Sequence, residues 1–293
     1  MKCNVCPREC MVDRSQSVGV CGETDKVRVA LASKHMWEEP CISGEKGSGT
    51  VFFTGCPLHC VYCQNGVIAN ENHGREVTIA ELSDIFLKQQ ESGVHNINLV
   101  TPTHFAIQIR EALILAKEKG LTIPVVYNTG SYEKIESLKL LEGLVDIYLP
   151  DMKYFSSELA KKYSKAPDYF QVAMTAIEEM YRQVGEAEFD DGGMMKKGVI
   201  VRHLLLPGSL ADSKEVVKAL FQKFGDSVYI SIMNQYTPME GIGEKYPELA
   251  NKVTEKDYDE LVDYAIDLGV ENGFIQEGET ASESFIPDFL REV

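Results

Sequence analysis

From about residue 50 onward, short apolar runs rich in β-branched residues alternate with stretches of helical periodicity. Several runs are continuously apolar, which is typical of strands buried on both faces of a parallel sheet. The alternation indicates parallel strands joined by right-handed crossover helices. It leaves open whether the sheet is an open doubly wound sheet or a full or partial barrel. The predicted strands span residues 51–53, 97–100, 124–127, 145–149, 199–206, 228–232 and 274–276.

Segments between these strands carry helix signals. Thr78 and Glu81 have capping-box spacing, and Thr254 and Gly269 stand where a helix start and a helix stop are expected. The predicted apolar faces consist of Leu82, Ile85, Phe86 and Gln89, then Val216, Val217, Leu220 and Phe224, and then Tyr258, Leu261, Val262, Ala265 and Ile266. A longer helix is predicted at residues 168–184, followed by an exposed loop at 189–198.

Charge and hydropathy exclude some classes of function. Forty-five acidic residues against 29 basic ones give a net charge of −16, which argues against binding to nucleic acid or to anionic membranes. No apolar run approaches the roughly 18–20 residues of a membrane helix. The first residues lack the apolar core of a secretory signal, so we expect a cytoplasmic protein.

Cysteine is distributed unevenly along the chain. In a reducing compartment, tight groups of cysteines indicate metal binding rather than disulfides. Cys41 stands alone, and we interpret it as a small buried hydrophobic residue. The other seven of the eight cysteines form an amino-terminal group and a second group, namely Cys3, Cys6, Cys10 and Cys21, and then Cys56, Cys60 and Cys63.

The second group lies in GCPLHCVYCQN, residues 55–65. It follows the first predicted strand, so the cysteines belong at the carboxyl ends of the strands, where ligands bind. Three thiolates leave one iron of a four-iron cluster without a protein ligand, and an open metal position marks a reacting centre. The alternative is a zinc site completed by His59 or Cys41, although His59 adjoins Cys60 and zinc sites usually use paired C-x2-C knuckles.

The C-x3-C-x-aromatic-C order resembles the signature of the radical S-adenosylmethionine (SAM) superfamily. The resemblance implies that Cys56, Cys60 and Cys63 hold a [4Fe–4S] cluster and that SAM chelates the open iron. Reduction then cleaves SAM to methionine and a 5′-deoxyadenosyl radical that abstracts a hydrogen atom. The resemblance also places Tyr62 near the adenine of SAM.

Four segments between about residues 45 and 240 resemble the pyruvate formate-lyase activating-enzyme group: the cysteine motif, YNTGSYE, YLPDMKYF and VRHLLLPGSLADS. By this resemblance Lys153 binds the SAM carboxylate and Arg202 the SAM ribose or carboxylate. Asp151, with the turn at Asn128 and Thr129, corresponds to a site for a monovalent cation beside SAM.

The chain departs from that group at three places. The acidic turn after the second strand, which receives the SAM amino group, is replaced by Thr101, Pro102 and Thr103. Asn128 stands in place of an aspartate. Tyr236 stands at about the position of a histidine near SAM.

The amino-terminal cysteines have the spacing C-x2-C-x3-C-x10-C. Four thiolates can form a closed site for zinc, or an iron–sulfur site that transfers electrons; the alternative is free thiols on a flexible tail. We expect residues 1–45 to form a small cysteine-rich metal-binding cap and residues 46–293 to form a partial (β/α)6-type parallel barrel.

The resemblance implies an enzyme that generates a glycyl radical on a partner protein and receives electrons from flavodoxin or ferredoxin. A second hypothesis directs the same chemistry at a small molecule or another macromolecule. A third is a non-enzymatic zinc or iron–sulfur binding module. No catalytic side chain beyond the cofactor-binding residues is assigned.

Overall fold

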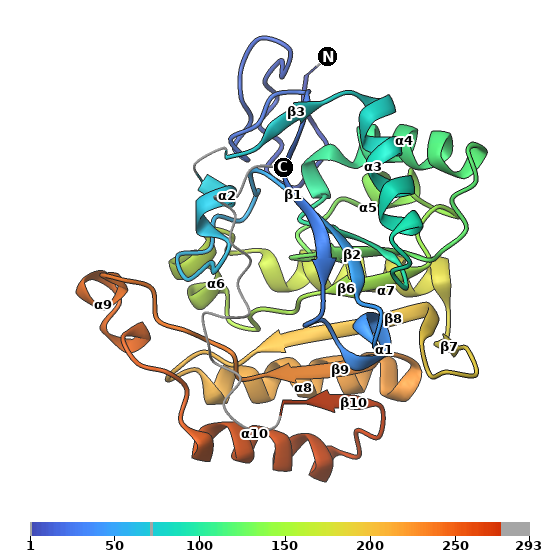
Figure 1. The fold of residues 1–293 in the computed structure, drawn as a ribbon. Coiled ribbons are helices and arrows are strands. Elements are labelled where there is room, and N and C mark those ends of the chain that lie inside the picture. Colours follow the sequence, from blue (N-terminus) through green and yellow to red (C-terminus); the bar gives the residue numbers. More distant parts are fainter. Residues whose placement is uncertain (1, 71–72, 277–293) are drawn as a thin grey trace.

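The protein is described here by a computed structural model that covers residues 2–70 and 73–276. Ten strands form one sheet in the order β10-β9-β8-β6-β5-β4-β2-β1-β3, and β7 pairs with β8. Neighbours from β2 to β10 along this path are parallel, whereas β1 and β3 pair antiparallel at the edge. Within the described ranges, β10 and β3 do not pair with each other. The sheet is therefore a partial barrel that hydrogen bonds do not close (Figure 1).

The elements have the following bounds. The strands are β1 (Val27–His35), β2 (Ser48–Phe53), β3 (Arg75–Val77), β4 (Ile97–Val100), β5 (Val125–Thr129), β6 (Ile147–Pro150), β7 (Glu188–Phe189), β8 (Met195–Leu204), β9 (Tyr229–Met233) and β10 (Gly273–Ile275). The helices are α1 (Pro40–Ser43), α2 (Gly66–Asn70), α3 (Ile79–Glu91), α4 (Ala106–Glu118), α5 (Ile135–Lys139), α6 (Ser157–Ser164), α7 (Tyr169–Val184), α8 (Leu210–Phe224), α9 (Ile242–Lys245) and α10 (Glu255–Leu268). Short 3₁₀ turns lie at Thr103–Phe105, Gly225–Ser227 and Pro247–Leu249.

The predicted strands and helices are confirmed, with shifts of a few residues at their ends. The Thr78 side chain accepts from the Glu81 N–H and the Glu81 carboxylate accepts from the Thr78 N–H, so the capping box is formed. Thr254 caps α10, and Gly269 ends it in the left-handed conformation at φ 96°. The predicted helix at 168–184 is α7.

Three expectations need correction. Residues 27–35, which were expected in the cap, form β1 of the main sheet. A domain boundary at residue 45 would therefore separate β1 from β2, the strand with which it pairs. Residues 189–198 form part of a β7–β8 hairpin in which Met195 is buried, because β8 begins at Met195, four residues before the apolar run that starts at residue 199. Ile266 is 64% exposed and lies outside the buried face of α10. Residues 277–293, which the predicted barrel domain includes, lie outside the described residues.

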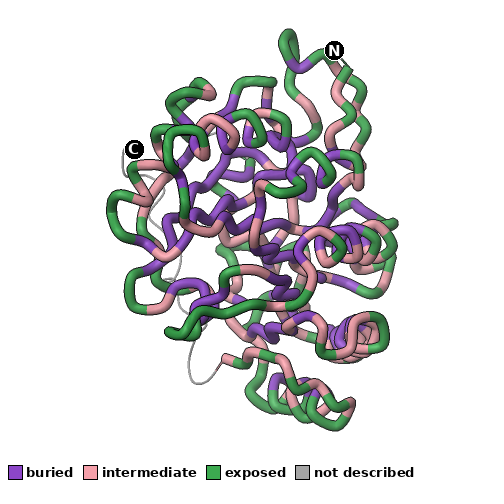
Figure 2. The backbone as a smooth tube through the Cα atoms, turned by 90° about the vertical axis from the view of Figure 1, so that its right-hand side faces the viewer, coloured by how far each residue is buried: buried purple, intermediate pink, exposed green. Residues whose placement is uncertain are grey.

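Successive side chains along a strand point to opposite sides of the sheet, alternately toward the outer helices and into the barrel. Leu99, Tyr127 and Val201 pack with the outer helices in the main core, whereas Val126, Leu149 and Ile200 point into the barrel. The buried residues accordingly follow the strands and the inner faces of the helices (Figure 2). The pattern explains why the central strands read as continuously apolar.

Helix α1 closes the amino end of the barrel. Its Cys41 and Ile42 pack against interior residues of β5, β6 and β8, and the Asn96 amide donates to the Ile42 carbonyl at 2.8 Å. Cys41 is buried, as expected. Because this end is filled by apolar side chains, the polar residues of the barrel gather toward the carboxyl ends of the strands.

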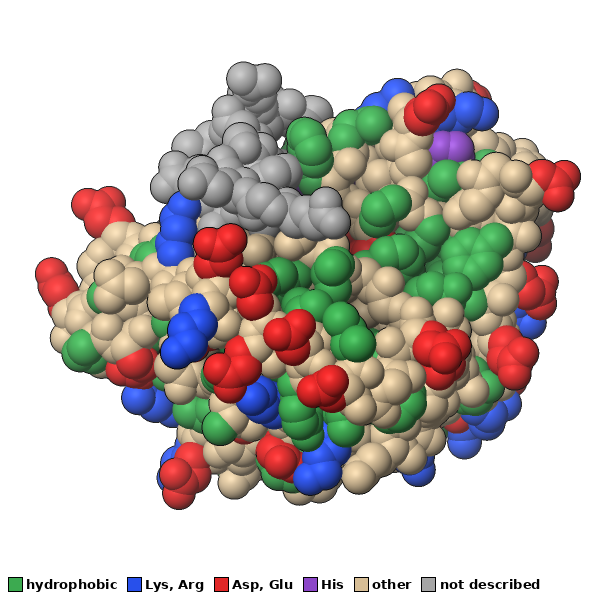
Figure 3. All heavy atoms as spheres, turned by 90° about the horizontal axis from the view of Figure 1, so that it is seen from below, with side chains coloured by type: hydrophobic (Ala, Val, Ile, Leu, Met, Phe, Trp, Pro, Cys, Tyr) green, Lys and Arg blue, Asp and Glu red, His purple; other side chains and the backbone are tan. Residues whose placement is uncertain are grey.

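On the face shown in Figure 3, the distribution of charged side chains agrees with the argument against binding to nucleic acid or anionic membranes. There, Lys and Arg side chains are interspersed with Asp and Glu rather than gathered in one patch. Among the described helices, none is both long and apolar enough to cross a membrane.

We expect Ile42→Ala to lower the free energy of unfolding by about 2–5 kcal/mol, because Ile42 is fully buried beneath the barrel. The matched change Ile266→Ala should alter it by less than about 0.5 kcal/mol, since Ile266 is exposed. Urea denaturation followed by circular dichroism measures both. Equal effects of the two substitutions would contradict the role assigned to α1.

Candidate cofactor site

A cavity of about 430 Å³ opens at the carboxyl ends of the strands, within the size range of small-molecule sites. It brings together most of the site residues predicted from the sequence. These are Cys56, Cys60, Tyr62, Cys63, Thr101, Asn128, Thr129, Asp151, Lys153 and Arg202. These residues lie near the carboxyl ends of β5 and β8 and in the segments that follow β2, β4 and β6. Residues as far apart in sequence as Cys56 and Arg202 therefore line the same cavity.

The loop after β2 carries the three cysteines. Gly55 has φ 75°, and a Cβ there would lie 2.6 Å from the Cys21 carbonyl oxygen, so only glycine fits this turn. The Cys60 sulfur accepts a hydrogen bond from the Ser164 hydroxyl at 3.0 Å, and the Cys56 sulfur accepts one from the Leu58 N–H at 3.4 Å. These contacts fix the thiols at the cavity wall.

Neither residue of the zinc alternative joins this group. Both ring nitrogens of His59 are hydrogen-bonded, one with Asn70 and the other with the Val20 carbonyl. Cys41 lies in the apolar cluster at the amino end of the barrel. The three cysteines therefore share the cavity without a fourth protein ligand from these two candidates.

The donor chemistry of the loop fits an iron–sulfur cluster. Burial raises the pKa of Cys56 to about 11 and of Cys63 to about 12, so ligation must displace protons from both thiols. The positive charge of Lys153 opposes part of each shift and favours thiolates. As the side chains stand, no three His, Cys, Asp or Glu residues of the described ranges are arranged to hold a metal ion.

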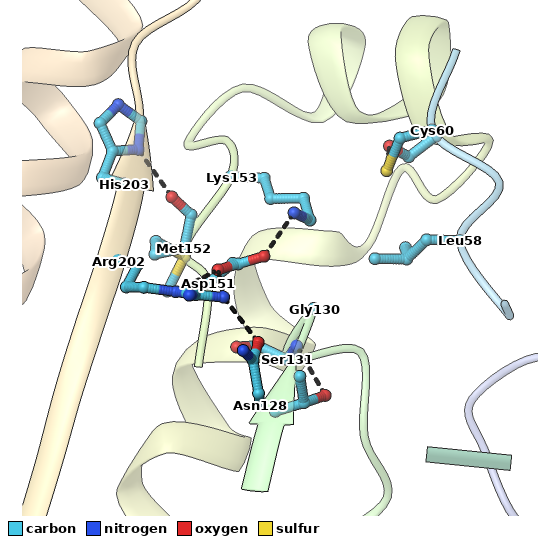
Figure 4. Close-up of polar contacts among 12 residues, drawn as sticks. Leu58, Cys60, Asn128, Gly130, Ser131, Asp151, Met152, Lys153, Arg202 and His203 are labelled. Carbon is cyan, nitrogen blue, oxygen red and sulfur yellow. Dashed lines mark hydrogen bonds and ion pairs between the residues drawn. The ribbon is translucent and has the colours of Figure 1, made fainter. Parts of the chain in front are cut away.

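Asp151 lies between two cations at the ends of β6 and β8 (Figure 4). Its carboxylate accepts from Lys153 Nζ at 2.6 Å and from Arg202 Nε at 3.1 Å. Burial would raise the pKa of Asp151, but the charges of Lys153 and Arg202 outweigh it and lower the pKa. All three side chains are thus charged and held at the cavity wall. Arg202 Nη2 also donates to the Asn128 side-chain oxygen at 2.6 Å.

Glu38 belongs to this network, although sequence reasoning missed it. Its carboxylate accepts from Arg202 Nη1 at 3.0 Å and from the Asn98 amide at 2.9 Å. Glu38 follows β1, the strand that was not predicted. The only sequence signal was a pair of glutamates before Pro40, in a segment assigned to the cap.

Glu133 is a second missed residue, six positions beyond Tyr127 in the quoted YNTGSYE segment. It is 3% exposed, and its Oε1 accepts from the Thr103 hydroxyl at 2.6 Å and from the Thr129 hydroxyl at 2.5 Å. Its Oε2 has no hydrogen-bond partner within the described part of the chain. Thr103 and Thr129 line the cavity, so Glu133 places a carboxylate directly behind the Thr101–Thr103 turn.

The two predicted tyrosines differ in position. Tyr62 lines the cavity and accepts at 2.7 Å from the Tyr154 hydroxyl. Tyr236 does not belong to the described lining: it is 1% exposed, and its hydroxyl donates to the Leu249 carbonyl at 2.6 Å. Its neighbours Met233 and Gln235 face the cavity instead.

The amino-terminal cysteines lie next to the loop after β2. The Cys56 N–H donates to the Cys21 carbonyl at 3.1 Å, and the Arg8 guanidinium donates to the Pro57 carbonyl at 2.7 Å. Cys6 and Cys21 are buried. A Cβ on Gly19 would lie 3.3 Å from the Cys21 sulfur and 3.4 Å from the Cys10 sulfur, so glycine leaves space between these thiols.

We expect the stability of the protein to depend on the protonation of Glu133. Burial raises the pKa of Glu133 from 4.5 to about 7, and hydrogen bonds from the hydroxyls of Thr103, Thr129 and Tyr127 oppose this only in part. The folded protein then holds a proton that the unfolded chain loses, so this contribution is complete below the unfolded pKa and is lost as the pH rises through the folded pKa. Relative to Glu133→Gln, the wild type should lose about 2–3 kcal/mol of unfolding free energy between about pH 5 and about pH 8.

Urea unfolding at the two pH values measures this difference. The control is Glu136→Gln, which changes an exposed glutamate of the same segment and should leave the pH dependence unchanged. If wild type and Glu133→Gln differ in unfolding free energy by the same amount at both pH values, the raised pKa of Glu133 is contradicted.

Comparisons with known proteins agree with this site. Residues 50–220 match the Radical SAM superfamily. The chain is 28% identical over 275 residues to an uncharacterized protein of Methanocaldococcus jannaschii, covering 90% of this chain and 74% of that one. It is 29% identical over 182 residues to the pyruvate formate-lyase-activating enzyme of Clostridium pasteurianum, covering 58% of this chain and 66% of that one.

The fold resembles that of Streptococcus suis SuiB bound to S-adenosylmethionine, with a TM-score of 0.53 and 16% identity over 78% of this chain. This chain spans about half of SuiB, 52% of its length. The family match covers more than half of the chain, includes the three-cysteine loop and ends beyond Arg202. The chain belongs to the radical SAM superfamily.

Proposed function

We propose that this protein binds a [4Fe–4S] cluster through Cys56, Cys60 and Cys63, and binds SAM in the adjoining cavity. The bound cluster would supply the electron that cleaves SAM to methionine and a 5′-deoxyadenosyl radical, which removes a hydrogen atom from a substrate. One observation carries the proposal: three thiols from a single loop share a cavity with the partly buried cations Lys153 and Arg202.

The cavity wall offers complementary partners for both charged ends of the methionine part of SAM. Lys153 and Arg202 would bind the carboxylate through charge-assisted hydrogen bonds. Asp151 holds both cations in place, so little side-chain entropy is lost on binding. Tyr62 lines the same cavity and is our candidate for contact with the adenine.

Thr103, in the turn after β4, and Thr129, at the end of β5, would receive the SAM amino group. Each donates its one hydroxyl hydrogen to Glu133, so both oxygens can only accept further hydrogen bonds, and Thr129 already accepts one from the Ser131 N–H. An ammonium group needs acceptors. Glu133 would thereby compensate, as a positioning residue, for the acidic side chain that the Thr101–Thr103 turn lacks.

For the substrate, our first candidate is a glycyl radical enzyme, which this protein would activate. The similarity to the Clostridium activating enzyme supports it. The second candidate is a small molecule or another macromolecule, and the replaced turn at Thr101–Thr103 favours it. Flavodoxin or ferredoxin is the proposed reductant, and a cytoplasmic location remains a prediction.

We also propose that Cys3, Cys6, Cys10 and Cys21 bind a second metal, as zinc or an iron–sulfur site. Backbone N–H groups two residues farther along the chain lie against three of the sulfurs: Arg8 against Cys6, Val12 against Cys10 and Glu23 against Cys21. Such N–H groups stabilise thiolates bound to metal. Metal binding would draw the four sulfurs together and fix the contact between Cys21 and the loop at Cys56.

Anaerobic, strongly reduced protein should convert SAM to 5′-deoxyadenosine and methionine, which chromatography quantifies. Cys60→Ala should lower the rate by at least about 100-fold, because one iron ligand is lost. Cys41→Ala should keep the rate, since Cys41 belongs to the apolar end of the barrel. Absence of 5′-deoxyadenosine from the iron-loaded wild type would refute the proposed function.

If the activase candidate is correct, adding a glycyl radical enzyme such as pyruvate formate-lyase should yield a glycine-centred radical signal in electron paramagnetic resonance. SAM cleavage without that signal would favour the second candidate.

Metal analysis tests the second site separately. The reconstituted wild type should contain more metal than the iron of a single cluster, which is about four atoms per chain. Cys21→Ala should lose only the excess, Cys60→Ala should lose the cluster iron, and Cys41→Ala should lose neither. A wild type with only about four irons and no zinc would refute the amino-terminal site.

A further inference from the structure

The cavity extends from the cysteine loop down into the barrel, where its floor is acidic. Glu38 and Glu39 lie between β1 and α1 and line the cavity together with Phe52, Leu204, Ser231 and Met233. Helix α1 below them fills the amino end of the barrel. The two glutamates therefore mark the deepest polar part of the space, beyond the cations assigned to SAM.

The charges of the lining do not balance. Lys153 pairs with Asp151, and Arg202 pairs with Asp151 and Glu38. All three nitrogens of the Arg202 guanidinium donate to Asp151, Glu38 or Asn128. Glu39 is left as the one carboxyl group of the lining that forms no ion pair within the described residues, although the charge of Arg202 acts on it.

Glu39 is buried without sufficient partners. It is 8% exposed, and the Ser231 hydroxyl hydrogen-bonds to its carboxyl group. Its Oε2 has no hydrogen-bond partner within the described residues. A buried carboxylate oxygen without a donor is costly, and native proteins keep such groups mainly where a ligand completes them.

The surroundings do not supply a further positive charge for Glu39. His35 also lines the cavity, but burial, aided by the charge of Arg202, lowers its pKa, so its ring is uncharged near pH 7. The lining of the same cavity also includes the aromatic side chains of Trp37, Phe52 and Phe274. Aromatic faces in a binding site favour a cationic group over a neutral one.

We propose that Glu39 binds a protonated amine of the substrate at the floor of the cavity. The inference deepens the proposed function and rests on it, because it assigns the substrate of the same cavity to amine-bearing molecules. The amine could belong to a small molecule or to a lysine side chain of a peptide, since both present the same ammonium group.

Binding can be followed by the fluorescence of Trp37, which is the one tryptophan of the chain and lines the same cavity as Glu39. The probes are n-butylammonium and n-butanol at equal ionic strength, which share their length but differ in charge. Reconstituted wild type should bind n-butylammonium at least about tenfold more tightly, as expected for a hydrogen bond to a charged group. Equal affinities would overturn the proposal.

Glu39→Gln should abolish this preference, whereas Glu45→Gln should keep it. Glu45 is exposed beyond α1 and does not line this cavity, so it controls for the loss of one negative charge. Retention of the preference in Glu39→Gln would overturn the proposal. If circular dichroism shows that Glu39→Gln does not fold, Glu39→Asp serves instead, because it keeps the charge and should keep a preference for the amine. Loss of that preference in folded Glu39→Asp would overturn the proposal.

A second pair of probes distinguishes the sources of the amine. These are a blocked Ala-Lys-Ala peptide and the same peptide with norleucine in place of lysine. Preference for the lysine peptide indicates a polypeptide substrate, and preference for n-butylammonium alone indicates a small amine. Formation of 5′-deoxyadenosine is measured on the same preparation. If the protein prefers the amine but forms no 5′-deoxyadenosine, the proposed function is refuted and the amine site is not. If it forms 5′-deoxyadenosine but shows no preference for the amine, only the amine site is refuted.

Discussion

The contact of Asp151 with Lys153 and Arg202 holds the mouth of the barrel together. Asp151 follows β6, Arg202 lies on β8, and the Met152 N–H also donates to the Arg202 carbonyl. The side chains of Lys153 and Arg202 are only 19% and 14% exposed, so both charges are largely removed from water and need partners. The arrangement keeps the two cations aligned at the cavity wall. A ligand carboxylate can therefore bind them without prior rearrangement.

The first residues of the chain contact the site in two places, beside the cysteine loop and inside the barrel. Residues 2–26 lie against the cysteine loop, where Cys21 accepts from Cys56 and Arg14 donates to the His104 carbonyl at 2.5 Å. After β1 the chain passes under the barrel, and Glu38 reaches Arg202 from inside. The segment expected to be a separate cap thus supplies part of the sheet and of the cavity. It is the reason why the acidic floor lies below the cofactor residues.

Much of this could be predicted from sequence, for identifiable reasons. Strands such as β4 are buried on both faces and give continuous apolar runs, and the spacing of three cysteines reflects a single short loop. Strand β1 was missed because it lies next to the edge strand β3 in the antiparallel part of the sheet, where its burial is partial and alternates irregularly. Glu38, Glu39 and Glu133 were missed because a buried carboxylate looks the same in sequence as an exposed one. Tyr236 was placed near SAM by the resemblance to the activating-enzyme group, which gives an approximate position along the chain but not the direction of the side chain.

The central claim is that the three thiols leave one iron open for SAM. The most direct test is electron paramagnetic resonance of the reconstituted and reduced protein, recorded anaerobically with and without SAM. The account predicts the signal of a reduced [4Fe–4S] cluster whose shape changes when SAM binds, because SAM becomes a ligand of the iron. A cluster signal that SAM leaves unchanged would contradict it.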